Sequence, residues 1–101
     1  MSSIEMSSLA KSIDDNISRL DNELVKNRYP NNLAAKDICN MINRDIDRIL
    51  SLVRDENKEF WEISIKLDGK FMMLDEFLFN VKMLASSRQY ELFNFFTSQF
   101  P

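Results

Sequence analysis

Apolar residues recur at steps of three and four along two long stretches, and this spacing constrains the fold more than any other feature. The first stretch holds Leu9, Ile13, Ile17, Leu20 and Leu24, and the second holds Ala35, Ile38, Ile42, Ile46, Ile49 and Val53. Polar and charged residues fill most of the positions between them, so each stretch predicts an amphipathic helix. We expect one helix from about Ser8 to Asn27 and a second to about Glu56 or Lys58, with residues 1–7 flexible.

The segment between the two stretches, residues 28–32, predicts a turn. Pro30 disfavours helix in the residue before it, and Asn32 is suited to cap the helix that follows. A connection this short lays two helices antiparallel, as a helical hairpin. Two narrow seams alone would leave apolar surface exposed, so we expect the C-terminal third, a second copy of the chain or a partner to cover them.

The spacing changes to a period of two after Lys58. Trp61, Ile63, Ile65 and Leu67 alternate with polar residues, which is typical of a half-buried strand. Asp68 and Gly69, the only glycine, suit a two-residue hairpin turn with positive φ. We predict a β-hairpin at about 61–74; the alternative continues the second helix through Glu62 and breaks it at Gly69.

Two short helices are expected after the hairpin. Asp75 is placed to cap a helix over Glu76 to Ala85, and Ser86 with Gln89 has the capping-box spacing that opens another. A chain of 101 residues has room for one domain. The predicted fold is therefore a single domain, residues 1–101, mainly α with a minor α+β character.

Few residues can carry out catalysis. The chain has no histidine, one glycine and one cysteine, Cys39, which removes the commonest general base, phosphate-cradling loops and clustered thiolate zinc sites. We expect Cys39 to be a small buried hydrophobe. We predict no enzyme activity, no metal and no cofactor.

One short segment resembles a known enzyme family. Residues 17–24, ISRLDNEL, resemble the opening helix of the all-helical chorismate mutases, which are of similar length. That resemblance implies a dicarboxylate bound by converging cations, but the family's essential arginine lies three positions before the isoleucine, where this chain has Asp14. The predicted β-hairpin also has no place in that fold. We interpret the resemblance as shared amphipathic patterning, and a small all-helical enzyme is the second alternative.

The net charge and the absence of targeting features limit the kinds of partner that the sequence predicts. The net charge is −3 with acids and bases intermixed, so no basic face is expected and nucleic acid is not a predicted partner. Residues 1–10 lack the features of a signal peptide, and no apolar run is long enough to cross a membrane. With a single cysteine, these features predict a cytoplasmic protein that does not bind membranes.

All eight phenylalanines lie in residues 60–100, more rings than a small domain readily buries with Trp61 and two methionines. We therefore predict a protein-interaction module that binds another protein and self-associates, with a dimer favoured. Its biology would be that of an assembly adaptor, a secretion chaperone or a phage or bacterial regulator. The candidate partner-binding residues are Met72, Met73, Phe77, Phe79, Tyr90, Phe93, Phe95, Phe96 and Phe100.

The first alternative is a toxin-neutralising immunity protein. Its recognition would be electrostatic, through an acidic surface. The candidate residues are Asp55, Glu56, Glu59, Asp75 and Glu76.

Overall fold

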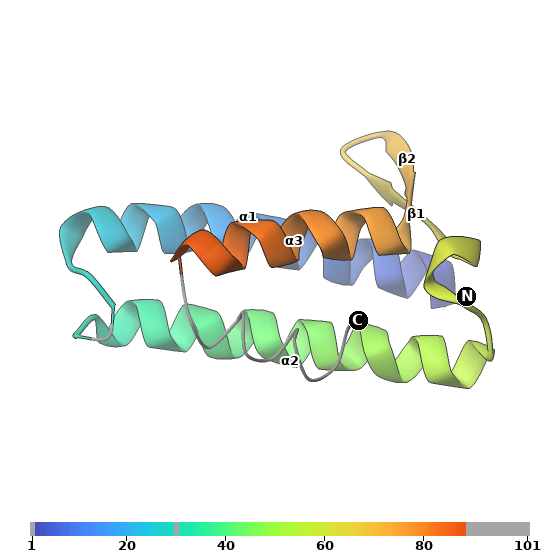
Figure 1. The fold of residues 1–101 in the computed structure, drawn as a ribbon, viewed down its shortest axis with the longest axis horizontal. Coiled ribbons are helices and arrows are strands. Elements are labelled where there is room, and N and C mark those ends of the chain that lie inside the picture. The colour runs from blue at the N-terminus through green and yellow to red at the C-terminus, as the bar shows by residue number, and fades with distance from the viewer. Residues whose placement is uncertain (1, 30, 89–101) are drawn as a thin grey trace.

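The computed structural model describes residues 2–29 and 31–88. Their elements are α1 (Ser2–Lys26), α2 (Leu33–Glu56), a 3-10 turn η1 (Phe60–Glu62), β1 (Ser64–Leu67), β2 (Lys70–Met73) and α3 (Leu74–Arg88). Figure 1 shows α1 and α2 antiparallel, with α3 running in the same direction as α1 and the β-hairpin standing at the end where α1 begins. The predicted mainly α fold with an N-terminal helical hairpin is confirmed.

The α1 stripe starts earlier than its spacing indicated. Met6 and Ala10 are fully buried with Ile13 and Leu20, whereas Leu9 and Leu24 lie at the margin of the core. The helix begins at Ser2, whereas the sequence predicted a start at about Ser8. The physical reason is tertiary: Met6 packs into the core, and the β-hairpin contacts the same part of α1.

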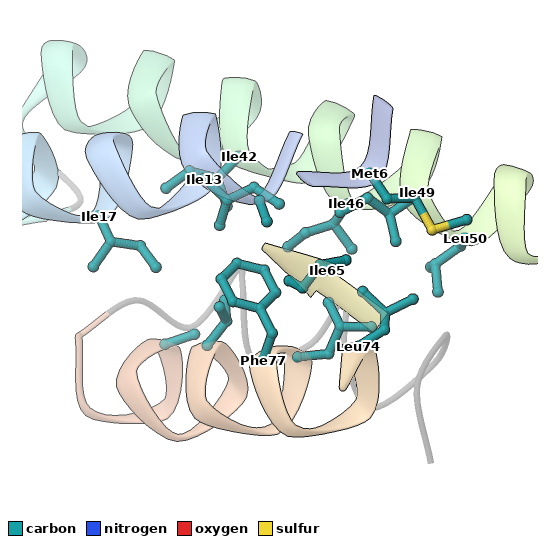
Figure 2. Close-up of a cluster of buried hydrophobic side chains, with 14 of the residues drawn as sticks. Met6, Ile13, Ile17, Ile42, Ile46, Ile49, Leu50, Ile65, Leu74 and Phe77 are labelled. Carbon is teal, nitrogen blue, oxygen red and sulfur yellow. The ribbon is translucent and has the colours of Figure 1, made fainter. Parts of the chain in front are cut away.

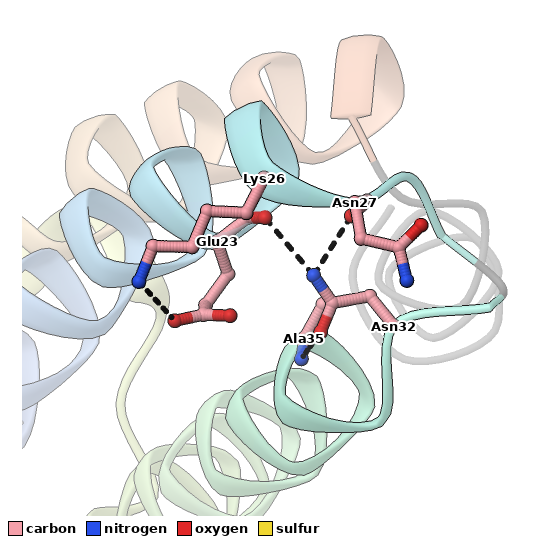
Figure 3. Close-up of polar contacts among 5 residues, drawn as sticks. All are labelled: Glu23, Lys26, Asn27, Asn32 and Ala35. Carbon is pink, nitrogen blue, oxygen red and sulfur yellow. Dashed lines mark hydrogen bonds and ion pairs between the residues drawn. The ribbon is translucent and has the colours of Figure 1, made fainter.

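Asn32 joins the two long helices. Its side-chain oxygen accepts the backbone N–H of Ala35 at 3.0 Å, which caps α2. Its amide nitrogen donates to the carbonyl of Glu23 at 2.9 Å and to that of Asn27 at 2.7 Å, both at the end of α1 (Figure 3). One buried side chain therefore serves the end of one helix and the start of the next.

The chain leaves α2 through Asn57, whose left-handed conformation (φ 54°) ends the helix. The alternative of a helix continuing through Glu62 is wrong. The strand also begins later than expected, at Ser64 rather than Trp61, because η1 intervenes. Within η1 the N–H of Glu59 donates to the Glu62 carboxylate at 3.3 Å, and the N–H of Glu62 donates to the Glu59 carbonyl at 3.0 Å.

The predicted β-hairpin is present. Its strands pair antiparallel, with Ile65 opposite Met72 and Lys66 opposite Phe71. Both turn residues have positive φ, 52° at Asp68 and 83° at Gly69, as a type I′ turn requires. The alternation places Ile65 against the core and Lys66 on the outer face.

Helix α3 follows β2 without a loop and covers the seam between α1 and α2. Figure 2 shows Leu74 and Phe77 pointing from α3 toward the isoleucines of the two long helices, with Ile65 of the hairpin between them. Leu78, Val81 and Ala85 complete the buried face of α3. The C-terminal third thus provides the cover that the two seams require.

The bounds of α3 differ from the sequence prediction. The helix begins at Leu74, where the Leu74 N–H donates to the Ile63 carbonyl at 2.8 Å, and Asp75 therefore lies inside the first turn. At the other end Ser86 lies within the helix and donates its hydroxyl to the Met83 carbonyl, so it does not cap a new helix. The rest of the second predicted C-terminal helix lies outside the described residues.

Candidate interaction surface

A groove of about 460 Å³ lies between the first turns of α1 and the outer face of the β-hairpin. It is lined by Ile4, Ser7, Ser64, Ile65, Lys66, Gly69 and Phe71. Ile4 is 71% exposed and Phe71 is 75% exposed, so two large apolar side chains face solvent in one hollow. We call these seven residues the α1–hairpin groove.

Two contacts between distant parts of the chain fix the shape of the groove. The backbone N–H of Lys66 donates to the Ser7 hydroxyl at 2.9 Å, which joins the outer edge of β1 to α1. Beyond it, the Lys11 ammonium bonds the Asp68 carboxylate at 2.9 Å and Asp15 at 3.2 Å. These two carboxylates raise the pKa of Lys11, with the Asp68 hydrogen bond as the larger cause.

Lys66 and Phe71 form the hairpin side of the groove. They are cross-strand partners, and the Lys66 ammonium lies 5.5 Å from the centre of the Phe71 ring. Lys66 is the only charged residue in the lining, so the groove combines apolar surface with one cation.

The sequence prediction did not select Ile4 or Phe71, although one signal was available for Phe71. A two-residue turn at Asp68 and Gly69 places Phe71 opposite Lys66, on the face away from Ile65. Its exposure followed from the hairpin register. Ile4 had no such signal, because its position depends on how the hairpin packs on α1.

The four predicted aromatic and methionine residues that the structure describes do not form one exposed surface. Phe77 is only 4% exposed and belongs to the core, so its assignment as a partner-binding residue is wrong; it lies on the side of α3 that faces the seam. Phe79 is 55% exposed. Met72 and Met73 are partly buried, and Met72 packs against the core. The remaining five candidates, Tyr90, Phe93, Phe95, Phe96 and Phe100, lie outside the described residues.

Other exposed apolar side chains are distributed over several elements. Trp61 of η1 is 61% exposed, and Met83 lies one turn beyond Phe79 on α3. Val25 and Leu33 are exposed at the opposite end, beside the connection between the two long helices. None of these residues lines the α1–hairpin groove.

The five acidic candidates do come to one end of the molecule. Asp55 and Glu56 end α2, Glu59 precedes η1, and Asp75 with Glu76 begins α3. These segments lie together at the end where α2 finishes (Figure 1). Within residues 2–29 and 31–88, no ion pair involves any of the five.

A second hollow, of about 390 Å³, lies between the end of α1 and the start of α2. Its charges largely compensate each other, because Lys26 lies 3.6 Å from Glu23 and Arg19 faces the same hollow as Asp37. Arg19 also donates to the Asn16 side-chain oxygen at 2.9 Å. This hollow therefore offers no net charge to a partner, and more of its lining surface is polar than apolar.

Reactive groups do not converge in the described part of the chain. Within it, no three acidic or cysteine side chains are placed to hold a metal ion. Cys39 is fully buried, as predicted. The described helices also lack an apolar stretch of the length needed to cross a bilayer.

None of the known protein families, curated proteins or solved structures compared with the chain matches it.

Proposed function

We propose that this protein is a non-catalytic interaction module that binds another protein through the α1–hairpin groove. One observation carries the proposal: Ile4 and Phe71, both more than two-thirds exposed, share a hollow whose walls are fixed by contacts with the rest of the fold. Exposed apolar hollows with a few polar groups are where protein and peptide ligands bind most strongly.

The groove is favoured over the exposed side chains of α3 because of its shape. Phe79 and Met83 lie one turn apart on α3, and neither lines the α1–hairpin groove or the second hollow. A partner side chain placed between Ile4 and Phe71 would lose contact with water on more than one side, which increases the apolar area it buries. Assembly adaptors, secretion chaperones and phage or bacterial regulators are the classes of protein-binding protein that we propose for this chain.

The test is affinity capture from cells of the source organism with the tagged full-length chain and two matched variants. Phe71→Ser removes the ring from the groove, and Phe79→Ser removes an exposed ring from α3 that does not line the groove. We expect Phe71→Ser alone to lose the captured partner, with roughly 30-fold weaker binding to the purified partner, as for a central interface residue.

The proposal fails if Phe71→Ser binds the purified partner as tightly as the unchanged protein, or if Phe79→Ser produces the larger loss. Circular dichroism of both variants checks that each is folded. Salt provides a second criterion, because an apolar contact keeps its dissociation rate in high salt.

The second candidate, an immunity protein that binds through the acidic end, has one observation in its favour: Asp55, Glu59 and Glu76 are exposed at the same end of the fold. Arg54 and Lys58 lie in the same region and reduce the local negative charge, which is why this candidate ranks second. Steep loss of association rate with added salt, and weaker binding by Asp55→Asn rather than Phe71→Ser, would favour it.

A further inference from the structure

The outer edge of β2 has unpaired backbone hydrogen-bonding groups. In an antiparallel pair, successive residues direct their N–H and C=O alternately toward and away from the neighbouring strand. The Leu74 N–H donates to the Ile63 carbonyl, and the two-residue turn closes on the pair formed by Leu67 and Lys70. Lys70 and Met72 of β2 therefore direct their backbone N–H and C=O groups toward β1, and so does the N–H of Leu74 at the start of α3.

Phe71 and Met73 must then direct their N–H and C=O groups away from β1. The first strand independently supports this alternation of backbone directions, because the Lys66 N–H points away from β2 and donates to the Ser7 hydroxyl. Among residues 2–29 and 31–88, no side chain or loop residue bonds the N–H of Phe71, the N–H of Met73 or the carbonyl of Phe71. Met73 directly precedes α3, so its carbonyl accepts the first backbone bond of that helix. Two donors and the Phe71 carbonyl thus form an open edge, with neither the bulge nor the proline that commonly protects such edges.

This edge is complementary to itself. We propose that two copies of the chain pair through β2, antiparallel, about a twofold axis at Met72. In this register Phe71 lies opposite Met73 of the second copy. The Met73 N–H of each copy donates to the Phe71 carbonyl of the other, which gives two hydrogen bonds, and the Phe71 N–H faces the Met73 carbonyl, which also accepts the first bond of α3. A register shifted by one residue would align none of these groups.

Side chains favour the same register. Phe71 and Met73 lie on the outer face of the hairpin, opposite Lys66 and Ser64 in the pairing, so each ring would lie beside a methionine of the second copy. Lys70 would lie opposite Leu74 of the second copy, next to the acidic first turn formed by Asp75 and Glu76. No ion pair within the described part of the chain uses Lys70, Asp75 or Glu76.

The pairing would make one four-stranded sheet whose outer face carries both α1–hairpin grooves. It does not depend on the proposed function, because it concerns the backbone edge of β2, whereas the groove uses the Phe71 side chain together with β1 and α1. A monomer that still loses its partner on Phe71→Ser would refute the pairing and leave the proposed function intact.

The first test measures molar mass by light scattering and sedimentation of the full-length protein from about 1 µM to about 1 mM. We expect a reversible dimer. Met73→Pro removes the outward N–H and no ladder bond within the hairpin, so it should fold and weaken the dimer about 30-fold, the effect of two lost hydrogen bonds of ~1 kcal/mol each. Met73→Thr is the matched control: it keeps the N–H and should dimerise far more tightly than Met73→Pro.

The second test fixes the register by cross-linking. At the axis, Met72→Cys places two thiols on directly opposed residues about 4.5 Å apart at their Cα atoms, within disulfide range. Lys70→Cys, on the same strand, would place them four residues apart, about 13 Å along the strand. We expect a covalent dimer from Met72→Cys under mild oxidation, and none from Lys70→Cys or from the unchanged chain with its buried Cys39.

Three results would overturn the proposal. The first is a monomer over the whole concentration range. The second is a dimer that Met73→Pro leaves unchanged, which would place the interface elsewhere. The third is equal cross-linking of Met72→Cys and Lys70→Cys, which would exclude this register. Binding of an unrelated extended peptide to the β2 edge, without self-association of the chain, would also overturn the proposal.

Discussion

Replacing Asn32 with alanine tests how the two long helices are joined. The substitution removes three hydrogen bonds at once: the cap on the Ala35 N–H and the two bonds donated to the carbonyls of Glu23 and Asn27. The Asn32 side chain is buried, so water replaces these bonds poorly, and the Ala35 N–H is left without its cap.

The expected cost is worked out from these contacts. Loss of an N-terminal cap costs about 1 kcal/mol, and each of the two other hydrogen bonds contributes about 1 kcal/mol net. Glu23 keeps one bond at its carbonyl, from the Asn27 N–H at 3.1 Å, which lowers the total. We expect Asn32→Ala to lower the free energy of unfolding by about 2.5 kcal/mol, which for a domain of this size is a drop in Tm of roughly 10–20 °C.

Urea unfolding followed by circular dichroism measures the effect, with an unchanged slope showing that the unfolded state is comparable. Asn32→Ser keeps a cap oxygen but has no amide to donate, so it should cost about 1–1.5 kcal/mol. Asn31→Ala is the matched control, because in the described contacts Asn31 uses its backbone and not its side chain, and it should change stability by less than about 0.5 kcal/mol. If Asn32→Ala costs less than Asn32→Ser, or no more than Asn31→Ala, the side chain does not join the helices as described.

Three further predictions follow from burial, backbone geometry and charge. Phe77→Ala should lower stability by about 3–5 kcal/mol in urea unfolding while Phe79→Ala changes it by less than about 1 kcal/mol, and similar losses would contradict their burial. Gly69→Ala should cost about 1 kcal/mol through backbone strain alone at φ +83°, since its Cβ would meet open space, and Gly69→Asn should cost less in the same urea unfolding experiment. The pKa of Lys11 is raised, so the folded protein holds this proton more tightly than the unfolded chain does. The stability that Lys11 contributes is therefore full below pH 10.5 and is lost as the pH rises through the folded-state pKa. Lys11→Met should remove this alkaline loss of stability in a pH titration of Tm, and an unchanged loss in the variant would assign it to another group.

Local patterns were sufficient to predict most elements of this fold. The 3.6-residue period predicted α1 and α2, Asn32 predicted where α2 begins, and the Asp68–Gly69 turn predicted the hairpin. The sequence predictions that failed share one cause: they concern residues whose structure depends on contacts between distant parts of the chain. Residues 2–7 are helical because Met6 packs in the core.

The candidate site was harder to predict than the fold. Phe77 and Phe79 are two residues apart on one helix, and only the position of the α1–α2 seam decides which of them is buried. Predicting the groove would have required both the hairpin register and the way the hairpin packs on α1. The sequence predicts the register but not the packing. Ile4 therefore looked like part of a flexible terminus.

The described core also bears on why Phe71 is exposed. Leu74, Phe77 and Ile65 already cover the seam between the long helices, so the ring of Phe71 is not a core side chain that the small fold failed to enclose. A polar residue at that position would leave the core unchanged and would keep the hairpin turn and ladder. An aromatic ring at a position where stability does not require one is best explained by contact with another molecule, which is why the substitutions at Phe71 and Met73 are the decisive ones.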